Sequence, residues 1–327
     1  MINLLKSFQR RQFLSTVAAL AIASSIPLTA QAEDLTLRIG FQKAASLLTL
    51  IKAQGTLEKE FAKNNVNVKW IEFPAGPQLL EGLNVGSVDF GYVGEAPPIF
   101  AQAAGANFVY AGYEAPSPRA EAILIPKDSN IKNVADLKGK KVALNKGSNV
   151  HYLLVKALEK NGLKYSDIQP VFLPPADARA AFERGSVDAW VIWDPFAAAA
   201  EKQVGAKVLQ SADGIVNNQS FFLAERTFAQ KNPAVLNKLL DELGKQGKWI
   251  VKNNKQAAQL LSPLQGLDTP VVELSISRYS HDVRPITDAV LAEQQNIADT
   301  FFELKLIPKK IQVSDAQLKP GITTAGK

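Results

Sequence analysis

The chain of 327 residues contains no cysteine, so it can form no disulfide and offers neither a thiolate nucleophile nor a cysteine for a lipid anchor. Its two histidines, His151 and His281, lie far apart, and their spacing does not predict a metal site. Basic residues exceed acidic ones by only six, and the two kinds are interspersed along the chain. Such a distribution argues against nucleic acid as a partner, because that binding requires a basic patch.

Long apolar runs are scarce as well. The run at 13–28 is interrupted by serine, threonine and proline, and it is too short and too polar to span a membrane. It follows three basic residues and precedes an A-x-A pattern at 30–32, which is typical of a cleaved secretory signal. We therefore predict a signal peptide at 1–32 and a periplasmic mature chain. The segment Arg10-Arg11-Gln12-Phe13-Leu14 also resembles a twin-arginine motif, so the twin-arginine and general secretory routes both stay open.

The sequence nearly repeats itself once. GSVDFGYVGEAPP at 86–98 is echoed by GSVDAWVIWDPF at 185–196, and Glu95 and Asp194 hold matching places at an offset of 99 residues. Upstream of each copy, strand-like and helix-like segments alternate in the same order. This alternation predicts an α/β protein of two lobes, each with a mainly parallel sheet flanked by helices. The alternative is that unrelated α/β units share similar helix-to-strand turns.

The predicted division of the chain is discontinuous. Lobe I takes residues 33–124 and 223–327, and lobe II takes residues 125–222. Segments 120–126 and 220–224 are strand-like, so we expect them to form a two-strand hinge. From Pro233 onward the apolar spacing is helical, which predicts a helical C-terminal return that packs on lobe I.

Loop-to-helix transitions at strand ends expose backbone N–H groups and the positive ends of helix dipoles, a combination that favours an anionic ligand. The clearest candidate lies at 145–151. Gly147 allows close approach of a backbone, Ser148 offers a hydroxyl, Asn149 begins the helix, and His151 follows in the first turn. Taken alone, Ser148 is better explained as a helix N-cap with no ligand role.

Two further groups follow predicted strands of lobe II. Asp177 stands where a helix begins and is the expected N-cap. Trp190, Trp193 and Asp194 lie on and after the third strand, where tryptophans can form an apolar wall for a ligand. Alternation along the strand leaves open that one tryptophan belongs to the core.

Three longer segments carry a family resemblance: PPIFAQAAGA at 97–106, KGSNVHYLL at 146–154, and DARAAFERGSVDAWVIWDP at 177–195. Together they closely resemble the aliphatic sulfonate-binding proteins of ATP-driven importers. The resemblance implies the two-lobed periplasmic binding protein fold of type II. It also implies a monomer without cofactor that delivers an organosulfonate to a membrane permease driven by a cytoplasmic ATPase. The expected ligand-binding residues are Gln42, Lys43, Gly94, Glu95, Gly147, Ser148, Asn149, His151, Asp177, Trp190, Trp193 and Asp194.

Glu95 departs from the family pattern, which has aspartate in some relatives. An unpaired carboxylate pointing at a sulfonate would repel it, so we expect Glu95 to pair with Lys43 or with an amino group of the ligand. Other small anions, such as taurine, nitrate or sulfate, remain alternative ligands. Enzymes also occur on this fold, but the chain lacks cysteine and shows no evident nucleophile–base pair, which argues against catalysis.

Overall fold

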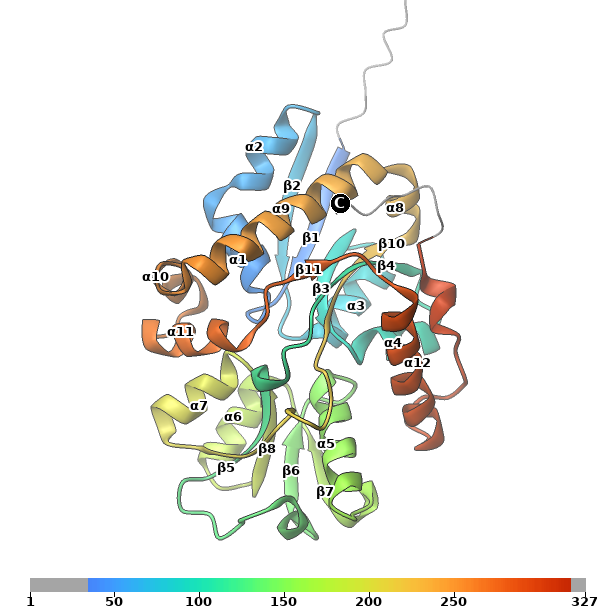
Figure 1. Ribbon diagram of the computed structural model, residues 1–327. Helices are drawn as coiled ribbons and strands as arrows, with labels where there is room; N and C mark the ends of the chain where they lie inside the picture. The colour runs from blue at the N-terminus through green and yellow to red at the C-terminus, as the bar shows by residue number, and fades with distance from the viewer. Residues whose placement is uncertain (1–34, 319–327) are drawn as a thin grey trace, which may run out of the picture. The chain divides into compact units, whose positions relative to one another are not determined.

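The computed structural model describes residues 35–318, so the predicted signal at 1–32 lies outside the described residues. Within that range the strands form a six-stranded and a five-stranded sheet, each flanked by helices (Figure 1). The first sheet contains β1 (Leu35–Phe41), β2 (Val66–Glu72), β3 (Phe90–Gly94), β4 (Phe108–Glu114), β10 (Ser220–Glu225) and β11 (Val283–Arg284). The second contains β5 (Glu121–Ile125), β6 (Lys141–Leu144), β7 (Gln169–Phe172), β8 (Ala189–Trp193) and β9 (Lys207–Ser211).

The helices of the first half of the chain are α1 (Ser46–Gln54), α2 (Thr56–Ala62), α3 (Gly76–Asn84), α4 (Pro97–Ala103), α5 (Asn149–Lys160) and α6 (Pro175–Glu183). Those of the second half are α7 (Phe196–Val204), α8 (Arg226–Lys231), α9 (Pro233–Lys252), α10 (Asn254–Gln265), α11 (Thr269–Arg278) and α12 (Asp288–Glu303). None of the helices within 35–318 is long and apolar enough to cross a membrane.

The two sheets follow one plan. The strand order β2-β1-β3-β10-β4 in the first sheet matches β7-β6-β8-β5-β9 in the second. In each, one antiparallel strand is inserted beside parallel strands: β10 pairs with β3 and β4, and β5 pairs with β8 and β9. The prediction of two lobes with a common plan is therefore confirmed, although the inserted strand makes both sheets mixed.

The repeated aspartates explain the sequence echo physically. Asp89 Oδ2 accepts a hydrogen bond from the backbone N–H of Arg38 at 2.8 Å, and Asp188 Oδ2 accepts one from Lys141 N at 2.8 Å. In lobe I this carboxylate joins the start of β3 to β1, and in lobe II it joins the start of β8 to β6. The matching positions thus perform the same local task twice.

Sheet membership corrects the predicted lobe boundaries. The predicted divisions at 124/125 and 222/223 fall inside β5 and β10. Hydrogen bonding places all of β5 in the second sheet and all of β10 in the first, so the chain crosses between sheets at 115–120 and 212–219. The predicted boundaries lie several residues too far along the chain, because the sequence does not distinguish each inserted strand from the crossing that precedes it.

The two crossings lie side by side and are hydrogen-bonded to each other (Figure 1). Ser117 N donates to Asn217 O at 3.1 Å and to Asn218 O at 3.2 Å. In return, Asn218 Nδ2 donates to Ser117 O at 2.9 Å. These bonds tie the two crossings into a double connection, whose segments precede the strand-like segments 120–126 and 220–224 that were expected to form it.

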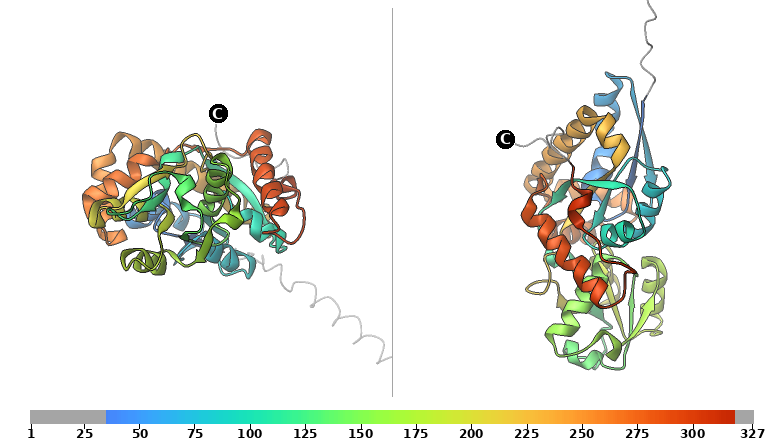
Figure 2. Two further views of the ribbon diagram at one scale, coloured as in Figure 1. Left: turned by 90° about the horizontal axis from the view of Figure 1, so that it is seen from below. Right: turned by 90° about the vertical axis from the view of Figure 1, so that its right-hand side faces the viewer.

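Helices cover both faces of the first sheet, which is why β10 is apolar at consecutive positions. Phe221 and Leu223 pack in one core with α3, α4 and α12, whereas Phe222 and Ala224 pack in another with α1, α9 and α10. A strand buried on both faces needs such a run, because successive side chains point to opposite faces. Helices α9, α10 and α12 of the C-terminal return therefore pack on lobe I, as predicted, whereas α11 also packs on α7 of lobe II. Figure 2 shows α12 along one side of the molecule.

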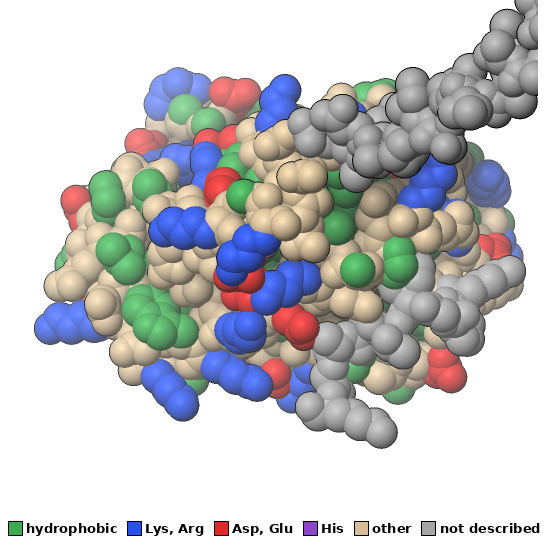
Figure 3. All heavy atoms as spheres, turned by 90° about the horizontal axis from the view of Figure 1, so that it is seen from above, with side chains coloured by type: hydrophobic (Ala, Val, Ile, Leu, Met, Phe, Trp, Pro, Cys, Tyr) green, Lys and Arg blue, Asp and Glu red, His purple; other side chains and the backbone are tan. Residues whose placement is uncertain are grey.

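Charged side chains on the outer surface of the described residues are mixed in sign. On the face shown in Figure 3, lysine and arginine side chains lie among aspartate and glutamate side chains. Several form local pairs on or between helices, including Lys156 with Glu159 and Arg179 with Glu183. This mixture agrees with the interspersed charge of the sequence.

We predict that Gly247→Ala destabilises the protein, because helix α9 approaches the backbone at His281 through this glycine. A Cβ at position 247 would lie 2.0 Å from His281 O, an atom fixed in the main chain. Overpacking of this kind costs about 1–3 kcal/mol. The matched control is Gly244→Ala on the same helix, where a Cβ meets nothing within 4 Å. Alanine there should be neutral or stabilise by up to about 1 kcal/mol. Urea unfolding measures both variants, and equal free energies of unfolding would contradict the prediction.

Candidate ligand-binding cleft

A small cavity lies where the carboxyl ends of strands from both sheets face each other. Its volume is about 20 Å³, room for roughly one water molecule. It is lined by Gln42, Ala44, Gly76, Tyr92, Gly94, Pro97, Ser148, Asn149, Trp193, Asn218, Ser220 and Tyr279. Both lobes and the second crossing contribute, which is where an α/β fold of this kind places its ligand.

Three helices of eight or more residues begin at this cavity. Helix α1 starts two residues after Ala44, α3 starts at Gly76, and α5 starts at Asn149. Their first-turn N–H groups and positive dipole ends therefore lie around the cavity. No lysine, arginine or histidine belongs to its lining. The cavity can thus attract an anion through backbone dipoles and neutral donors rather than through a cationic side chain.

Five residues expected from the sequence line the cavity: Gln42, Gly94, Ser148, Asn149 and Trp193. Gln42 Nε2 donates to Tyr92 O at 3.1 Å, which fixes the amide at the end of β1. Ser148 occupies the N-cap position of α5, but its hydroxyl donates to Asn145 O at 2.7 Å instead of capping the helix. Their roles in ligand binding stay predictions.

Asn149 connects the cleft to a buried network. Its Nδ2 donates to Glu121 Oε2 and to Asn218 Oδ1, while its Oδ1 lies against Gly94 of the opposite lobe. A Cβ at position 94 would stand 2.6 Å from Asn149 Oδ1, so the two lobes meet here through the absence of a side chain. Both donors of the Asn149 amide are therefore used inside the protein.

Lys43 and Glu95 do not face the cavity and do not pair with each other. Lys43 Nζ donates to Gln265 O at 2.9 Å, and Gln265 Nε2 donates back to Lys43 O at 2.8 Å, which anchors α10. Glu95 Oε2 accepts from Gln219 N at 3.0 Å. The predicted Lys43–Glu95 pair is therefore wrong, because each side chain finds a partner in a segment that the sequence could not place.

Gly147 and His151 lie behind the cavity in an aromatic contact between the lobes. The His151 ring centroid is 6.3 Å from that of Phe100 and 5.6 Å from that of Phe301, both from lobe I. Its Nδ1 accepts from Gly147 N at 3.3 Å. Burial lowers the pKa of His151 to about 4, with a further contribution from the charge of Lys146. The imidazole is therefore neutral at physiological pH and gives an anion no charge.

Asp177 and Trp190 of lobe II lie outside the lining of the cavity. Asp177 is exposed and stands inside the first turn of α6, whose N-cap is Pro174, so the predicted cap is wrong. Trp190 is fully buried in the lobe II core, where its ring lies 5.9 Å from that of Phe182. The core alternative for one tryptophan thus holds for Trp190, whereas Trp193 reaches the cavity.

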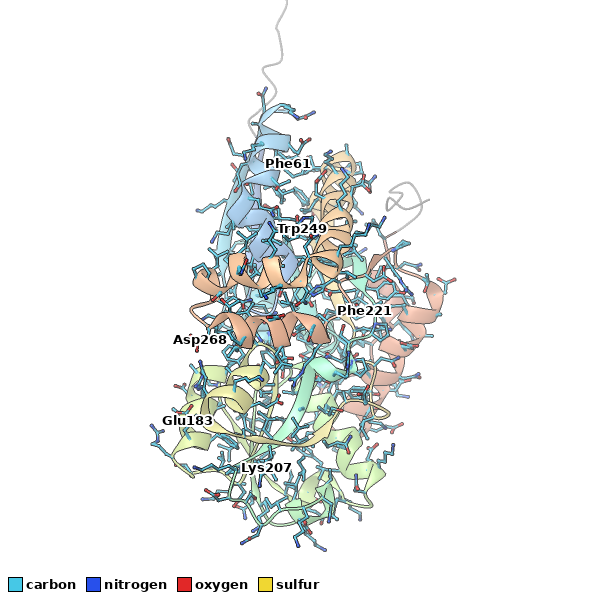
Figure 4. All side chains as sticks on the ribbon, turned by 60° about the vertical axis from the view of Figure 1, so that its left-hand side comes forward. Phe61, Glu183, Lys207, Phe221, Trp249 and Asp268 are labelled. Atoms are coloured by element: carbon cyan, nitrogen blue, oxygen red, sulfur yellow. The ribbon has the colours of Figure 1, made fainter. Side chains whose placement is uncertain are left out.

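Asp194 joins the lobes on the side opposite the aromatic contact. Arg278 of α11 forms an ion pair with Glu201 at 2.7 Å and lies 3.4 Å from Asp194 Oδ2, and the Tyr279 hydroxyl donates to Asp194 O at 2.9 Å. Next to these pairs, Ala198 and Ala199 of α7 pack on Val271 of α11. Figure 4 shows α11, which begins beside the labelled Asp268, lying over lobe II.

Several lining residues carried no local sequence signal. Asn218 comes from the second crossing, Ser220 is the first residue of β10, and Tyr279 directly follows α11. Tyr92 could have been found, because it precedes the end of β3 by two residues. The others are brought to the cavity only by tertiary packing.

A larger cavity of the described residues lies elsewhere. It measures about 590 Å³ and is an open depression between α9 and the segment 280–285 on the outside of lobe I. The short strand β11 borders this depression, but no helix begins there, so we place the candidate site in the smaller cavity. Within residues 35–318 there is also no cluster of three metal-ligating side chains.

Four buried carboxyl groups surround the cleft: Glu95, Glu114, Glu121 and Asp194. Burial raises the pKa of Glu95 to about 8, of Glu114 to about 7 and of Asp194 to about 7, and it raises the pKa of Glu121 well above its usual range. Arg278 acts in the opposite direction on Asp194 but does not outweigh burial. These groups therefore retain protons at higher pH than exposed carboxyls do.

The sheets and the position of the cleft define a two-lobed periplasmic binding protein fold of type II, and comparison with solved structures supports this. The alkanesulfonate-binding protein SsuA from Xanthomonas axonopodis pv. citri bound to MOPS has a TM-score of 0.84 and 42% identity, over 88% of this chain and 99% of that one. The periplasmic aliphatic sulphonate-binding protein SsuA from Escherichia coli has a TM-score of 0.79 and 46% identity, over 86% and 97%.

The chain belongs to the NMT1/THI5-like family, whose pattern matches residues 60–257, and within it to the aliphatic sulfonates-binding proteins. A relative of that name from Escherichia coli strain K12 is 45% identical over 93% of this chain and 95% of its own length. The desulfurization enzyme DSZB is similar in fold alone, with a TM-score of 0.66 and 16% identity.

We predict that Asp194→Asn removes part of the pH dependence of stability. The folded pKa of about 7 lies above the ordinary value of 3.8, so the stability contribution of Asp194 is present at low pH and is lost as the pH rises towards 7. Relative to the variant, the wild type should lose about 2 kcal/mol of unfolding free energy between pH 5.5 and 8. Asparagine can still accept the bond from Ala198 N. Urea unfolding at both pH values measures the difference, and parallel pH profiles would contradict it.

Proposed function

We propose that this protein is the substrate-binding component of an ABC importer. It captures aliphatic sulfonates in the periplasm and delivers them to a membrane permease coupled to a cytoplasmic ATPase. It acts as a monomer, without a cofactor and without catalysing a reaction. The observation that carries the proposal is the convergence of the N-termini of α1, α3 and α5 on a cavity without cationic side chains, in a chain closely related to sulfonate-binding proteins.

The two kinds of lining suit the two parts of an alkanesulfonate. Backbone N–H groups at the helix starts bind the sulfonate oxygens, because these groups have no partner within the helix. Trp193, Tyr92 and Pro97 provide apolar surface for the alkyl chain. A purely inorganic anion would leave that surface without a partner.

Binding requires movement. A cavity of about 20 Å³ holds roughly one water molecule and cannot hold a sulfonate group of four heavy atoms. The ligand therefore enters while the lobes are apart, and closure about the two crossings then buries it, which is the hinge motion typical of this class. The permease recognises the closed, loaded form.

An enzyme on the same fold is the alternative from another class. Ser148 and Ser220 supply the serine hydroxyls of the cavity, but its lining includes no histidine or lysine that could act as a base towards them. The Ser148 hydroxyl also donates to a backbone carbonyl. These contacts favour binding over nucleophilic catalysis.

Calorimetric titration of the mature protein tests the proposal. The ligands are alkanesulfonates of increasing chain length, with taurine, nitrate, sulfate, phosphate and an amino acid as comparisons. We expect binding of alkanesulfonates, with affinity that rises with chain length as more apolar surface is buried. Silence towards alkanesulfonates together with clear binding of another anion would retain the receptor role and reject the ligand class.

We predict that Gly94→Ala weakens sulfonate affinity at least tenfold. The new methyl group would meet Asn149 Oδ1 at 2.6 Å, so the lobes could close only with displacement of that side chain. A penalty of about 1.4 kcal/mol gives a tenfold loss, within the range for overpacking. The variant should unfold at nearly the wild-type temperature, because the separated lobes leave room for the methyl group. Gly244→Ala is the control that should bind normally, and undiminished binding by Gly94→Ala would contradict close approach of the lobes at this point.

A further inference from the structure

Two buried carboxyl groups stand next to the candidate cleft without a cationic partner. Glu95 is 3% exposed and Glu121 is fully buried. One oxygen of each is used: Glu95 Oε2 accepts from Gln219 N, and Glu121 Oε2 accepts from Asn149 Nδ2. The Oε1 atoms of both residues are buried with no hydrogen-bond partner. Half of each carboxyl group is therefore unsatisfied.

The groups around this pair are acidic or neutral. Glu95 faces Glu121, Glu293 of α12 and Tyr152 of α5. Glu121 also faces Tyr279, which in turn lies near Tyr92, Glu114 and Asp194.

The basic side chains of this region are engaged elsewhere. Arg278 is paired with Glu201 and Asp194, and Arg119, two residues before Glu121, is exposed. Within residues 35–318, no lysine, arginine or histidine forms an ion pair with Glu95 or Glu121. The pair therefore has no counter-charge to hold it ionised.

Ionising such a pair in the closed arrangement is unfavourable. A buried carboxylate without a partner costs several kcal/mol, and a second one beside it adds repulsion. Burial accordingly raises the pKa of both groups. A bound sulfonate would bring a third negative charge, and Asn149, which lines the cavity, donates a hydrogen bond to Glu121. The bound anion and the ionised carboxylates thus compete for stabilisation by the same polar groups around Asn149.

We propose that closure on an organosulfonate is coupled to uptake of a proton by the Glu95–Glu121 pair, with Asn149 linking Glu121 to the bound anion. The inference rests on the proposed function. Glu121 is a positioning residue, since it acts through Asn149. The proton comes from the solvent and adds to a carboxylate oxygen, because a sulfonate is too weak a base to carry it.

Separation of the lobes reverses the proton uptake. Gly94 of lobe I covers Asn149, and Glu95 itself belongs to lobe I whereas Glu121 begins β5 of lobe II. When the lobes part, water reaches both carboxyls and the neighbouring charge is removed, so their pKa values return towards the ordinary 4.5. Closed and open forms then differ in bound protons between about pH 5 and 8, and affinity falls as the pH rises through this window.

The test is calorimetric titration of the wild type with an alkanesulfonate at pH 6 to 8.5. Buffers without a sulfonate group are required, and phosphate and Tris differ in protonation enthalpy. The difference in observed heat between them gives the number of protons taken up. We expect uptake of at least one proton near pH 7.5 and a dissociation constant that rises at least about tenfold per pH unit there.

Glu121→Gln and Glu95→Gln identify the groups, since glutamine mimics the protonated acid at every pH. Each should flatten the pH profile, and Glu121→Gln should bind more tightly than the wild type at pH 8.5. If the two carboxyls had only a structural role, each substitution would weaken binding equally at all pH values. Glu242→Gln is the matched control: this buried carboxylate pairs with Lys238 and Lys245, lies on α9 and should leave proton uptake unchanged.

The outcomes separate the two proposals. Sulfonate binding without proton uptake, or wild-type pH slopes in both glutamine variants, would overturn the coupling and leave the proposed function intact. Absence of sulfonate binding at every pH would overturn the proposed function, and the coupling with it. If Glu121→Gln does not fold, Glu95→Gln carries the same comparison.

Discussion

The insertion of a returning strand into each sheet is the constraint on which the rest of the structure depends. Because β10 lies between β3 and β4 of the first sheet and β5 lies between β8 and β9 of the second, the two crossings that precede them are short. The crossings lie against each other through the bonds between Ser117 and Asn218. A connection of this kind allows rotation of the lobes but little sliding. It also fixes which strand ends face each other, and so determines where the cleft forms.

The cleft shows how an anion can be recognised without a cation. An exposed ammonium group is strongly hydrated, and the long side chains of lysine and arginine lose entropy when they are held in place. Helix N-termini are already fixed by the fold, and their N–H groups are directed at the cavity at no further entropic cost. The absence of lysine and arginine from the lining is therefore compatible with anion binding, and it leaves the neighbouring carboxyls as the charges that matter most.

The sequence predicted the fold well because the relevant signals are local. The repeated aspartates 89 and 188 mark equivalent turns, and alternation of strands and helices gave two sheets of one plan. Site prediction was mixed. Gln42, Gly94 and Trp193 sit at strand ends and reach the cavity, but Lys43 is one residue further along and turns to α10. The direction of each side chain at a strand end depends on its tertiary partners, which the local sequence does not specify.

His151 and Glu95 illustrate the same limit. A histidine in the first turn of a helix near an anion site suggests a ligand role, yet its ring is taken up by the aromatic contact between lobes. The direction of Glu95 depends on Gln219, a partner 124 residues away in the second crossing. No periodicity or spacing near either residue encodes those partners.

The contacts between the lobes impose a balance that the buried carboxyls help to set. Aromatic packing around His151 and the ion pairs of Arg278 favour closure on two sides of the cleft. A receptor whose empty closed form were strongly favoured would reject its ligand, because the closed cavity of about 20 Å³ admits none. Desolvation of Glu95 and Glu121 opposes closure. In the empty protein the helix dipoles have no anion to stabilise, so they do not offset this free-energy cost. The bound anion then supplies the difference in free energy that makes closure depend on ligand.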